Sequence, residues 1–270
     1  PFGVSSAEGR KTMWIDMGEM RIQDSNPDTG LQADVLYSNL AYEPVGGLIR
    51  KVEITNLDSQ PAEYEIVDGM PSIVTHGLSN AALKETSRTM EAFIDVENLK
   101  NNLPFFKLRS TITDSAEIHG IEGGNFASAT VLKSGQQLSV HSIANPELIF
   151  GHDTSMQTPY GFETSDLETI IQQQSRQNIV CKTPCAFFGF KVQLLPGETV
   201  ILFSLYGFAS NINLLKRVSA DFSSPDFYIG KISEARSLVD DLVKPIATKT
   251  SSPEFDQYCR QTFLDNILRG

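Results

Sequence analysis

Four charged side chains lie close together in one irregular segment of the chain: Lys84, Glu85, Arg88 and Glu91. The alternation of apolar and polar residues breaks over residues 68–88, and residues 81–89 have a short helical pattern. Long irregular segments inside compact domains often carry function. These charges could therefore face a cleft shared with a neighbouring domain. They could instead form a local ion-pair network that pins the segment, and we favour that interpretation.

Two further pairs of residues have types that could do chemistry. His152 and Asp153 are adjacent and could serve acid–base or metal chemistry, although an exposed pair of this kind is usually ordinary surface. Cys181 and Cys185 could begin a metal site, but no second cysteine or histidine pair follows at a useful spacing. Three cysteines are also too few, and odd in number, for a disulfide framework. We therefore expect no metal site, buried reduced thiols and a cytoplasmic location.

The single tryptophan, Trp14, has two interpretations. Its flat apolar ring could stack on the C–H face of a pyranose. An aromatic residue in a mixed apolar run is more often part of the core, and this is what we expect for Trp14.

The composition is that of an ordinary soluble globular protein. Hydrophobic residues make up 40% of the 270 residues and charged residues 20%. The net charge of −11 and the lack of a lysine and arginine cluster argue against nucleic acid or an anionic membrane as a partner. No apolar run has the length of a membrane span, and no signal peptide opens the sequence. Because the chain starts at Pro1 and stops at Gly270 inside a helical pattern, we expect a fragment of a longer protein.

Alternating runs predict a large antiparallel sheet that would position these residues. Residues 48–55 alternate as a strand with one buried and one wet face, and residues 63–66 alternate again after a polar turn, which predicts a hairpin. Residues 185–208 predict a second, central hairpin across Pro196-Gly197. The other predicted strands are 13–22, 31–40, 90–97, 105–113, 124–132, 137–143 and 147–151.

Helical spacing replaces this alternation near the carboxyl end. Ser224-Pro225 predicts the start of a helix that ends at Lys244-Pro245, and Ser252-Pro253 predicts the start of a second one. The chain is therefore expected to be mainly β, with a large antiparallel sandwich over residues 1–222 and a helical segment over residues 223–270.

Several stretches carry a resemblance to a known enzyme family: "EPVGGLIRKVEITN", "VDGMPSIVTHGLSN", "LKETSRTMEAFIDVEN", the upstream "GLQADVLYSNLAYEPVGGLIRKVEITN" and the final "FDQYCRQTFLDNILRG". Together they resemble the amino-terminal domain of inverting glycoside phosphorylases of the cellobiose phosphorylase and β-1,3-glucan phosphorylase type. The resemblance implies a galactose-mutarotase-like super-β-sandwich, followed by two linker helices that lead to an (α/α) barrel.

The same resemblance implies a reaction for the parent protein. In that family, phosphate attacks the anomeric carbon of a β-glucoside while one carboxylic acid protonates the leaving oxygen, which yields an α-sugar 1-phosphate. The acid and the phosphate-binding residues belong to the barrel, so no catalytic residue is expected here and the chain alone should be inactive. The implied partners are an oligosaccharide or β-glucan, the barrel and a second copy in a homodimer. Inorganic phosphate is the implied co-substrate, and no cofactor is expected.

The resemblance also singles out Asp265, Asn266 and Arg269, in a stretch similar to the start of the family's barrel. Arg269 could lie near a saccharide or phosphate, but a cation at a helix carboxyl terminus is the interpretation that we favour. Other functional classes stay open. A stand-alone carbohydrate-binding or dimerisation sandwich would expose an aromatic platform or a partner surface. A mutarotase-type epimerase would need a histidine and carboxylate pair, and none of the four histidines has that context: His76, His119, His141 and His152.

Overall fold

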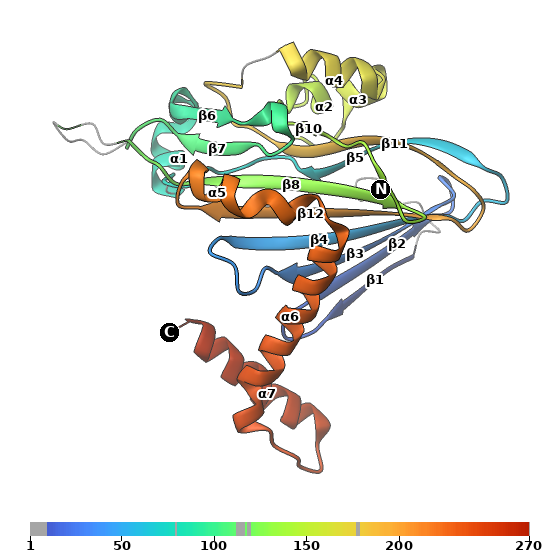
Figure 1. Ribbon diagram of the computed structural model, residues 1–270, viewed down its shortest axis with the longest axis vertical. Coiled ribbons are helices and arrows are strands. Elements are labelled where there is room, and N and C mark those ends of the chain that lie inside the picture. Colours follow the sequence, from blue (N-terminus) through green and yellow to red (C-terminus); the bar gives the residue numbers. More distant parts are fainter. Residues whose placement is uncertain (1–9, 79, 112–116, 118–119, 177–178, 270) are drawn as a thin grey trace.

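The structure of the protein is a computed structural model that describes residues 10–78, 80–111, 117, 120–176 and 179–269. Within these residues, nine strands form one antiparallel sheet and three form a second, which confirms the predicted mainly β sandwich (Figure 1). The large sheet contains β1 (Arg10–Ile15), β2 (Met20–Asn26), β3 (Leu31–Asn39), β4 (Gly46–Asn56), β6 (Ile94–Glu97), β7 (Phe105–Leu108), β8 (Gly124–Lys133), β9 (Gln136–Leu138) and β12 (Thr199–Ala209). The small sheet contains β5 (Ala62–Met70), β10 (His141–Ile143) and β11 (Ala186–Leu194). The strand order is β1-β2-β3-β4-β12-β8-β7-β6 in the large sheet, with β9 paired to β8, and β10-β11-β5 in the small one.

Helices surround the sheets. They are α1 (Asn80–Thr86), α2 (Glu147–Phe150), α3 (Tyr160–Thr164), α4 (Leu167–Arg176), α5 (Ile212–Val218), α6 (Pro225–Val243) and α7 (Pro253–Arg269), with short 3-10 turns at Ser87–Phe93, Leu99–Asn101, Ser219–Ser223 and Lys244–Ile246. Both predicted carboxyl-terminal helices are confirmed as α6 and α7. The predicted boundary between residues 222 and 223 falls just before α6, and the division into two units stays a prediction.

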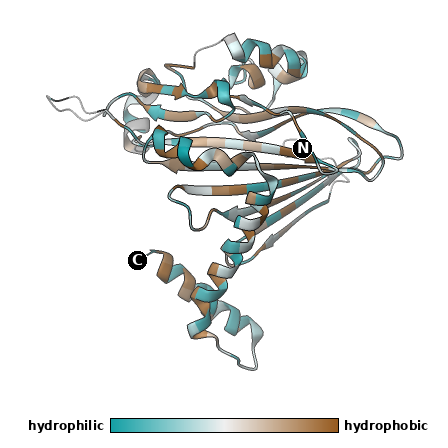
Figure 2. Cartoon of the chain, viewed as in Figure 1, coloured by the Kyte–Doolittle hydropathy of each residue, from teal (hydrophilic) through white to brown (hydrophobic). Residues whose placement is uncertain are grey.

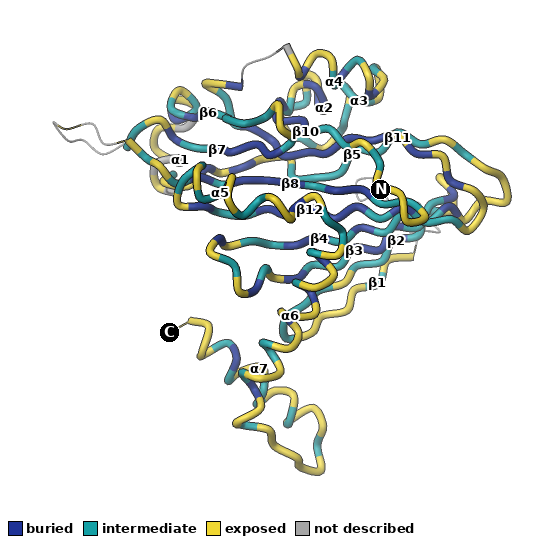
Figure 3. The backbone as a smooth tube through the Cα atoms, viewed as in Figure 1, coloured by how far each residue is buried: buried dark blue, intermediate teal, exposed yellow. Residues whose placement is uncertain are grey.

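The core has two layers, one on each face of the large sheet. Between the sheets, Val35, Val52 and Leu202 pack against Phe190 of the small sheet. On the opposite face, Phe203 stacks on Tyr228 of α6, with 5.3 Å between ring centroids. Buried strands therefore run through the centre of the molecule, whereas α7 is largely exposed (Figure 3). The central strands carry many hydrophobic residues, and α7 mixes hydrophobic with hydrophilic ones (Figure 2).

This second layer corrects the prediction of a wet face on β4 at one residue, Ile49. Ile49 lies on that face and is fully buried, in the same cluster as Leu205, Tyr228 and Ile232. Helix α6 supplies the cover at Ile49, whereas Lys51 and Glu53 on the same face keep 26% and 34% of their side chains exposed.

Neither predicted hairpin forms. β4 pairs with β12 and β3, whereas β5 pairs with β11 in the other sheet. Residues 185–208 were predicted to form a central hairpin. Each of its two strands is central in its own sheet, but β11 and β12 belong to different sheets and do not pair. The chain crosses from one sheet to the other between β4 and β5 and again between β11 and β12, and Asn56 contacts both connections. Its side chain donates to the carbonyls of Gln60 (3.0 Å) and Leu194 (3.1 Å). Its backbone carbonyl accepts from the Gly197 N–H (2.8 Å).

Other strand predictions are revised in length or type. The run 13–22 splits into β1 and β2 around a turn, and 137–143 splits into β9 and β10, which join different sheets. The strand predicted over 147–151 is wrong, because residues 147–150 form α2. In the predicted strand 90–97 only residues 94–97 are extended, as β6. The predicted strand 105–113 is shorter in the structure, because β7 ends at Leu108. The prediction of buried thiols holds for Cys185 only, because Cys181 is exposed and Cys259 half-buried.

Among the described helices, none has the length and apolar character that crossing a membrane requires.

Candidate functional site

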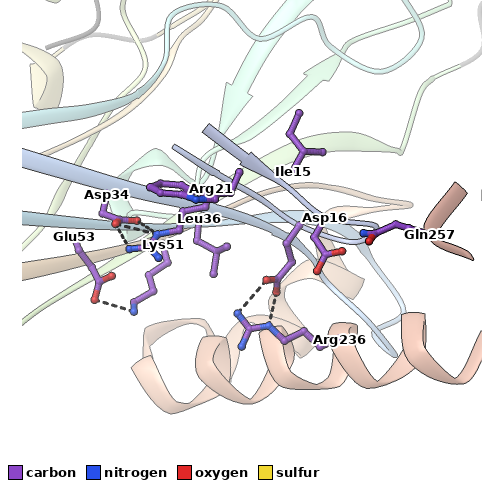
Figure 4. Close-up of a pocket in the computed structure, with 11 residues that line it drawn as sticks. Ile15, Asp16, Arg21, Asp34, Leu36, Lys51, Glu53, Arg236 and Gln257 are labelled. Atoms are coloured by element: carbon purple, nitrogen blue, oxygen red, sulfur yellow. Dashed lines mark hydrogen bonds and ion pairs between the residues drawn. The ribbon is translucent and has the colours of Figure 1, made fainter. Parts of the chain in front are cut away.

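A groove of about 590 Å³ lies on the large sheet where the outer strands meet α6 and α7 (Figure 4). Side chains of the strands, of the β1–β2 turn and of the two helices line it: Trp14, Ile15, Asp16, Glu19, Arg21, Asp34, Leu36, Lys51, Glu53, Arg236 and Gln257. Polar and charged groups from distant parts of the sequence thus converge on one surface.

The sheet register explains this convergence. Trp14 of β1 is paired with Arg21 of β2, Arg21 with Leu36 of β3, and Leu36 with Lys51 of β4. Paired residues in adjacent antiparallel strands point to the same face, so these four side chains form a row across the sheet. Asp34 lies two residues before Leu36 and therefore shares that face.

Ion pairs hold the charged groups of the groove in place. Arg21 Nε donates to Asp34 Oδ1 at 2.7 Å, and this hydrogen bond raises the pKa of Arg21. Arg236 of α6 binds Glu19 through two parallel hydrogen bonds of 2.8 and 3.0 Å, which likewise raise the pKa of Arg236. Bidentate pairing of this kind fixes the planes of both groups.

Trp14 is exposed, which corrects the prediction that it belongs to the core. Its side chain is 46% accessible, because β1 is the edge strand of the sheet. The guanidinium carbon of Arg21 lies 5.1 Å from the ring centroid, a cation–π contact that orients the indole. Gln257 reaches from α7 toward Asp16 on the other side of the groove (Figure 4). A flat ring beside fixed polar groups can bind a ligand with both apolar and hydroxyl-bearing surfaces.

The first set of predicted site residues lies away from this groove. Lys84 and Glu85 are exposed on α1, and Arg88 Nε lies 3.6 Å from Glu91 Oε2. Glu91 also accepts a hydrogen bond from the hydroxyl of Thr183 at 3.0 Å. The contacts of Arg88 and Glu91 have the form of the local network that the sequence favours, and a role in a cleft between domains stays a prediction.

The second predicted set lies near the end of α7. Arg269 Nε donates to Asp265 Oδ1 at 2.8 Å, one helical turn away, and Asn266 is exposed. α7 extends away from the sandwich, whereas α1 lies beside β6 and β7 (Figure 1), so the two sets do not come together. Binding of saccharide or phosphate by these three residues stays a prediction.

The His152–Asp153 pair is part of a surface loop. The Ser155 hydroxyl donates to Asp153 at 2.6 Å and the Thr158 N–H at 2.7 Å, and these bonds lower the pKa of Asp153 to about 2. The ring of His152 stacks on Tyr160 with 4.6 Å between centroids. Asp153 thus organises its own loop. Over the described part of the chain, no group of three or more histidine, cysteine, aspartate or glutamate side chains could hold a metal ion.

Sequence reasoning missed most of the groove, including Arg21, Asp34 and Arg236. A usable signal existed in Asp16-Met17-Gly18-Glu19, a polar turn that divides the run 13–22 into two strands. Recognising that turn places Trp14 opposite Arg21. Arg236 reaches the groove only because of the way α6 packs on the sheet, and no local sequence pattern predicts that packing.

No family model and no curated protein matches the sequence. Among solved structures, the chain is similar to a heparinase III (TM-score 0.34, 8% identity, 76% of this chain and 22% of that one). It is also similar to a protein described as a kojibiose phosphorylase from the human microbiome (TM-score 0.31, 9% identity, 92% and 23%). A third is a TPR-domain containing protein from Parabacteroides distasonis (TM-score 0.32, 12% identity, 96% and 47%). The chain therefore spans less than half of each of these structures, and at TM-scores below 0.5 the likenesses carry no argument about function.

Proposed function

We propose that this chain is a non-catalytic, saccharide-binding sandwich that accompanies the catalytic domain of a carbohydrate-active enzyme. The observation that carries the proposal is the exposed ring of Trp14, which Arg21 orients at a groove of fixed polar groups. The C–H face of a pyranose packs on such a ring, while carboxylate and amide groups bind the hydroxyls around its edge.

The charges of the groove suit a neutral sugar. Four carboxylates and three cations line it, which leaves a formal charge of −1. Arg21 and Arg236 are already engaged by Asp34 and Glu19. An anionic ligand would have to displace these carboxylates, whereas a neutral saccharide can add hydrogen bonds to groups already in position.

The finer part of the proposal rests on the sequence resemblance. We propose a parent enzyme that phosphorolyses β-glucosides or β-glucans with inversion, using inorganic phosphate as co-substrate and releasing α-glucose 1-phosphate. In this scheme a barrel domain supplies the acid and the phosphate site. This chain then needs no cofactor and is inactive alone. A homodimer and a cytoplasmic location belong to the same proposal.

Helix α7 supports the idea of an adjoining helical domain. Its side chains Phe255, Tyr258 and Leu268 are 52%, 66% and 69% exposed, although each is large and apolar or aromatic. Exposed apolar residues on one helix are typical of a surface that another element covers. A stand-alone carbohydrate-binding or dimerisation sandwich is the alternative, and it shares the groove but not the barrel.

Tryptophan fluorescence tests the binding step, since Trp14 is the single tryptophan. Titration with cellotriose and laminaritriose should change the emission saturably. Gln257→Ala should weaken binding about three- to tenfold, as expected for one lost hydrogen bond, and Lys84→Ala, outside the groove, should leave it unchanged. Emission that stays constant up to the solubility limit of both sugars would refute saccharide binding at the groove.

The catalytic step needs a separate assay on the full-length protein that carries this chain. Incubation with inorganic phosphate and β-glucans should release glucose 1-phosphate. Release without phosphate, or no release, would refute the phosphorylase part. Saturable fluorescence changes combined with no release would favour the stand-alone binding module.

A further inference from the structure

Strand β1 leaves one edge of the large sheet open. It is the last strand in the order of that sheet, and among the described strands it pairs only with β2 (Figure 1). Its apolar side chains are accessible: Met13 is 56% exposed, Trp14 46% and Ile15 75%. The register with β2 is continuous, and residues 10–15 contain no proline. A straight apolar edge without a bulge or proline can pair with another strand.

The hydrogen-bonding groups of this open edge include those of Met13 and Ile15. The N–H of Asp16 donates to the carbonyl of Glu19 at 2.9 Å, so these two residues form a hydrogen-bonded pair at the β1–β2 turn. Hydrogen-bonded and non-hydrogen-bonded pairs alternate along an antiparallel ladder. Met13 and Ile15 therefore occupy non-hydrogen-bonded positions, and their N–H and C=O groups point away from β2.

Charges at the two ends of β1 favour a second copy of this chain as the partner. Arg10 starts the strand and Asp16 directly follows it, and both are exposed. Within the described residues, neither side chain forms an ion pair. In an antiparallel pair with a two-fold axis at Met13, Met13 faces its own counterpart, and Arg10 of each copy faces Asp16 of the other. Opposite charges on directly facing residues stabilise strand pairing, and this register places such a pair at both ends.

The same register brings the two grooves together. Trp14 lies on the face of the sheet that carries the groove. With the axis at Met13, Trp14 of each copy lies opposite Thr12 of the other, so the two indoles are diagonal neighbours on one face. Such neighbours are about 7–8 Å apart, which is within reach of aromatic side chains. One saccharide can then stack on both rings.

We propose that two copies of this chain pair through β1, antiparallel about Met13, and that their grooves form one joint saccharide-binding surface. The pairing follows from the open edge and its charges. The joint surface rests on the function proposed above for the groove, and it makes the second copy a part of that site.

Sedimentation equilibrium tests the pairing, and wild-type protein should give twice the monomer mass. Met13→Pro removes an N–H that does not bond to β2. Proline is tolerated at such a position of an edge strand, so this variant should fold and be monomeric. Met13→Val is the matched control, because it keeps the N–H and should stay dimeric. Arg10→Asp places like charges opposite each other at both ends and should weaken the dimer about tenfold.

Two results would overturn the pairing. One is a monomeric wild-type protein, as expected if another segment or another protein covers this edge. The other is a dimer that neither folded Met13→Pro nor Arg10→Asp weakens. Circular dichroism establishes which variants are folded, and Arg10→Asp keeps the test valid if the proline variant is not.

Disulfide cross-linking tests the register in protein that also carries Cys181→Ser and Cys259→Ser. Met13→Cys should give a cross-linked dimer on mild oxidation, because Cα atoms of a hydrogen-bonded pair are about 5.5 Å apart, within disulfide reach. Ile15→Cys, on the same strand, is the control. Its two thiols would be offset by four residues, about 14 Å, and should stay reduced. Equal cross-linking of both variants, or of Ile15→Cys alone, would overturn the register.

Trp14 fluorescence separates the joint surface from the pairing. Monomeric Met13→Pro should bind cellotriose or laminaritriose about tenfold more weakly than wild type, because only one ring remains for each ligand. Equal affinity would refute the joint surface and leave the dimer standing. A dimer whose emission responds to neither sugar would refute the proposed function of the groove and leave pairing through β1 standing.

Discussion

The ion pair between Arg50 and Asp68 joins the two sheets through the core, and removing the carboxylate is expected to destabilise the sandwich strongly. Arg50 lies on β4 and Asp68 on β5, with distances of 2.6 Å from Nη1 to Oδ2 and 3.2 Å from Nη2 to Oδ1. The side chains are 7% and 19% exposed. Burial lowers the pKa of Arg50, but the charge and hydrogen bonds of Asp68 together raise it above its ordinary value. Arg50 therefore stays charged, and Asp68→Ala leaves that charge buried.

The magnitude follows from the asymmetry of a buried pair. Removing one partner costs about 3–5 kcal/mol of unfolding free energy, because an uncompensated charge remains in the core. Replacing both partners by apolar residues of similar volume is often close to neutral. We therefore expect Asp68→Ala to lose about 3–5 kcal/mol and Arg50→Met/Asp68→Leu to lose clearly less. The guanidinium carbon of Arg50 also lies 5.4 Å from the ring centroid of Tyr37. This cation–π contact makes a smaller contribution to the stability of the folded protein.

Urea denaturation monitored by circular dichroism measures these differences, provided that both variants unfold in one transition. Asp265→Ala is the matched control, because it breaks the Arg269–Asp265 pair on an exposed helix and should change stability by less than about 1 kcal/mol. An Asp68→Ala loss as small as that of the control, or a double variant less stable than Asp68→Ala, would refute this reasoning.

Three other predictions concern single side chains. The pKa of Asp153 is about 2 in the folded protein, below its ordinary 3.8. The ionised loop therefore contributes stability above about pH 4 that is lost as the pH falls toward 2. Ser155→Ala should raise this pKa in an NMR titration, and an unchanged value would contradict the assignment. Tyr228→Phe removes the hydrogen bond to the Phe222 carbonyl (2.8 Å) and should cost about 1–3 kcal/mol in urea unfolding, whereas no change would show that the carbonyl finds another donor. Burial raises the pKa of the Cys185 thiol, so Ellman's reagent should label Cys181 rapidly in native protein and Cys185 only after unfolding. Rapid labelling of all three thiols would argue against this packing.

Local sequence patterns predicted the strands near the centre of the sheets and the two final helices. The strand predicted over 31–40 corresponds to β3 and that over 124–132 to β8, because alternation and turn residues act over short distances. Helix α6 begins at Pro225, as the Ser224-Pro225 pair predicts. The prediction of a strand over 147–151 was wrong because the run is too short to show a period. A short apolar run fits a buried helical turn as well as a strand.

The candidate groove was much less accessible to prediction. Stacking of Trp14 on a sugar was one of two interpretations and stays a prediction, whereas the favoured interpretation, a place in the core, was wrong. Its exposure follows from the position of β1 at the edge of the sheet, which is a property of strand order. Likewise, Arg236 binds Glu19 across 217 residues of sequence, and no periodic pattern encodes a contact of that range.

Strand order is also the reason that both hairpin predictions were wrong. A polar turn between two alternating runs specifies that the chain reverses, but it does not specify whether the second run pairs with the first or crosses to a facing sheet. The crossing from β4 to β5 places Ile66 of β5 against the cluster that contains Val52 of β4, and pairing of the two strands within one sheet would not bury this layer between sheets. The two crossings lie together at Asn56, whose amide and carbonyl bind both connections. In this protein the side chain of Asn56 thus satisfies carbonyls on both connections, a role that the turn residues do not reveal because it depends on the two crossings lying together.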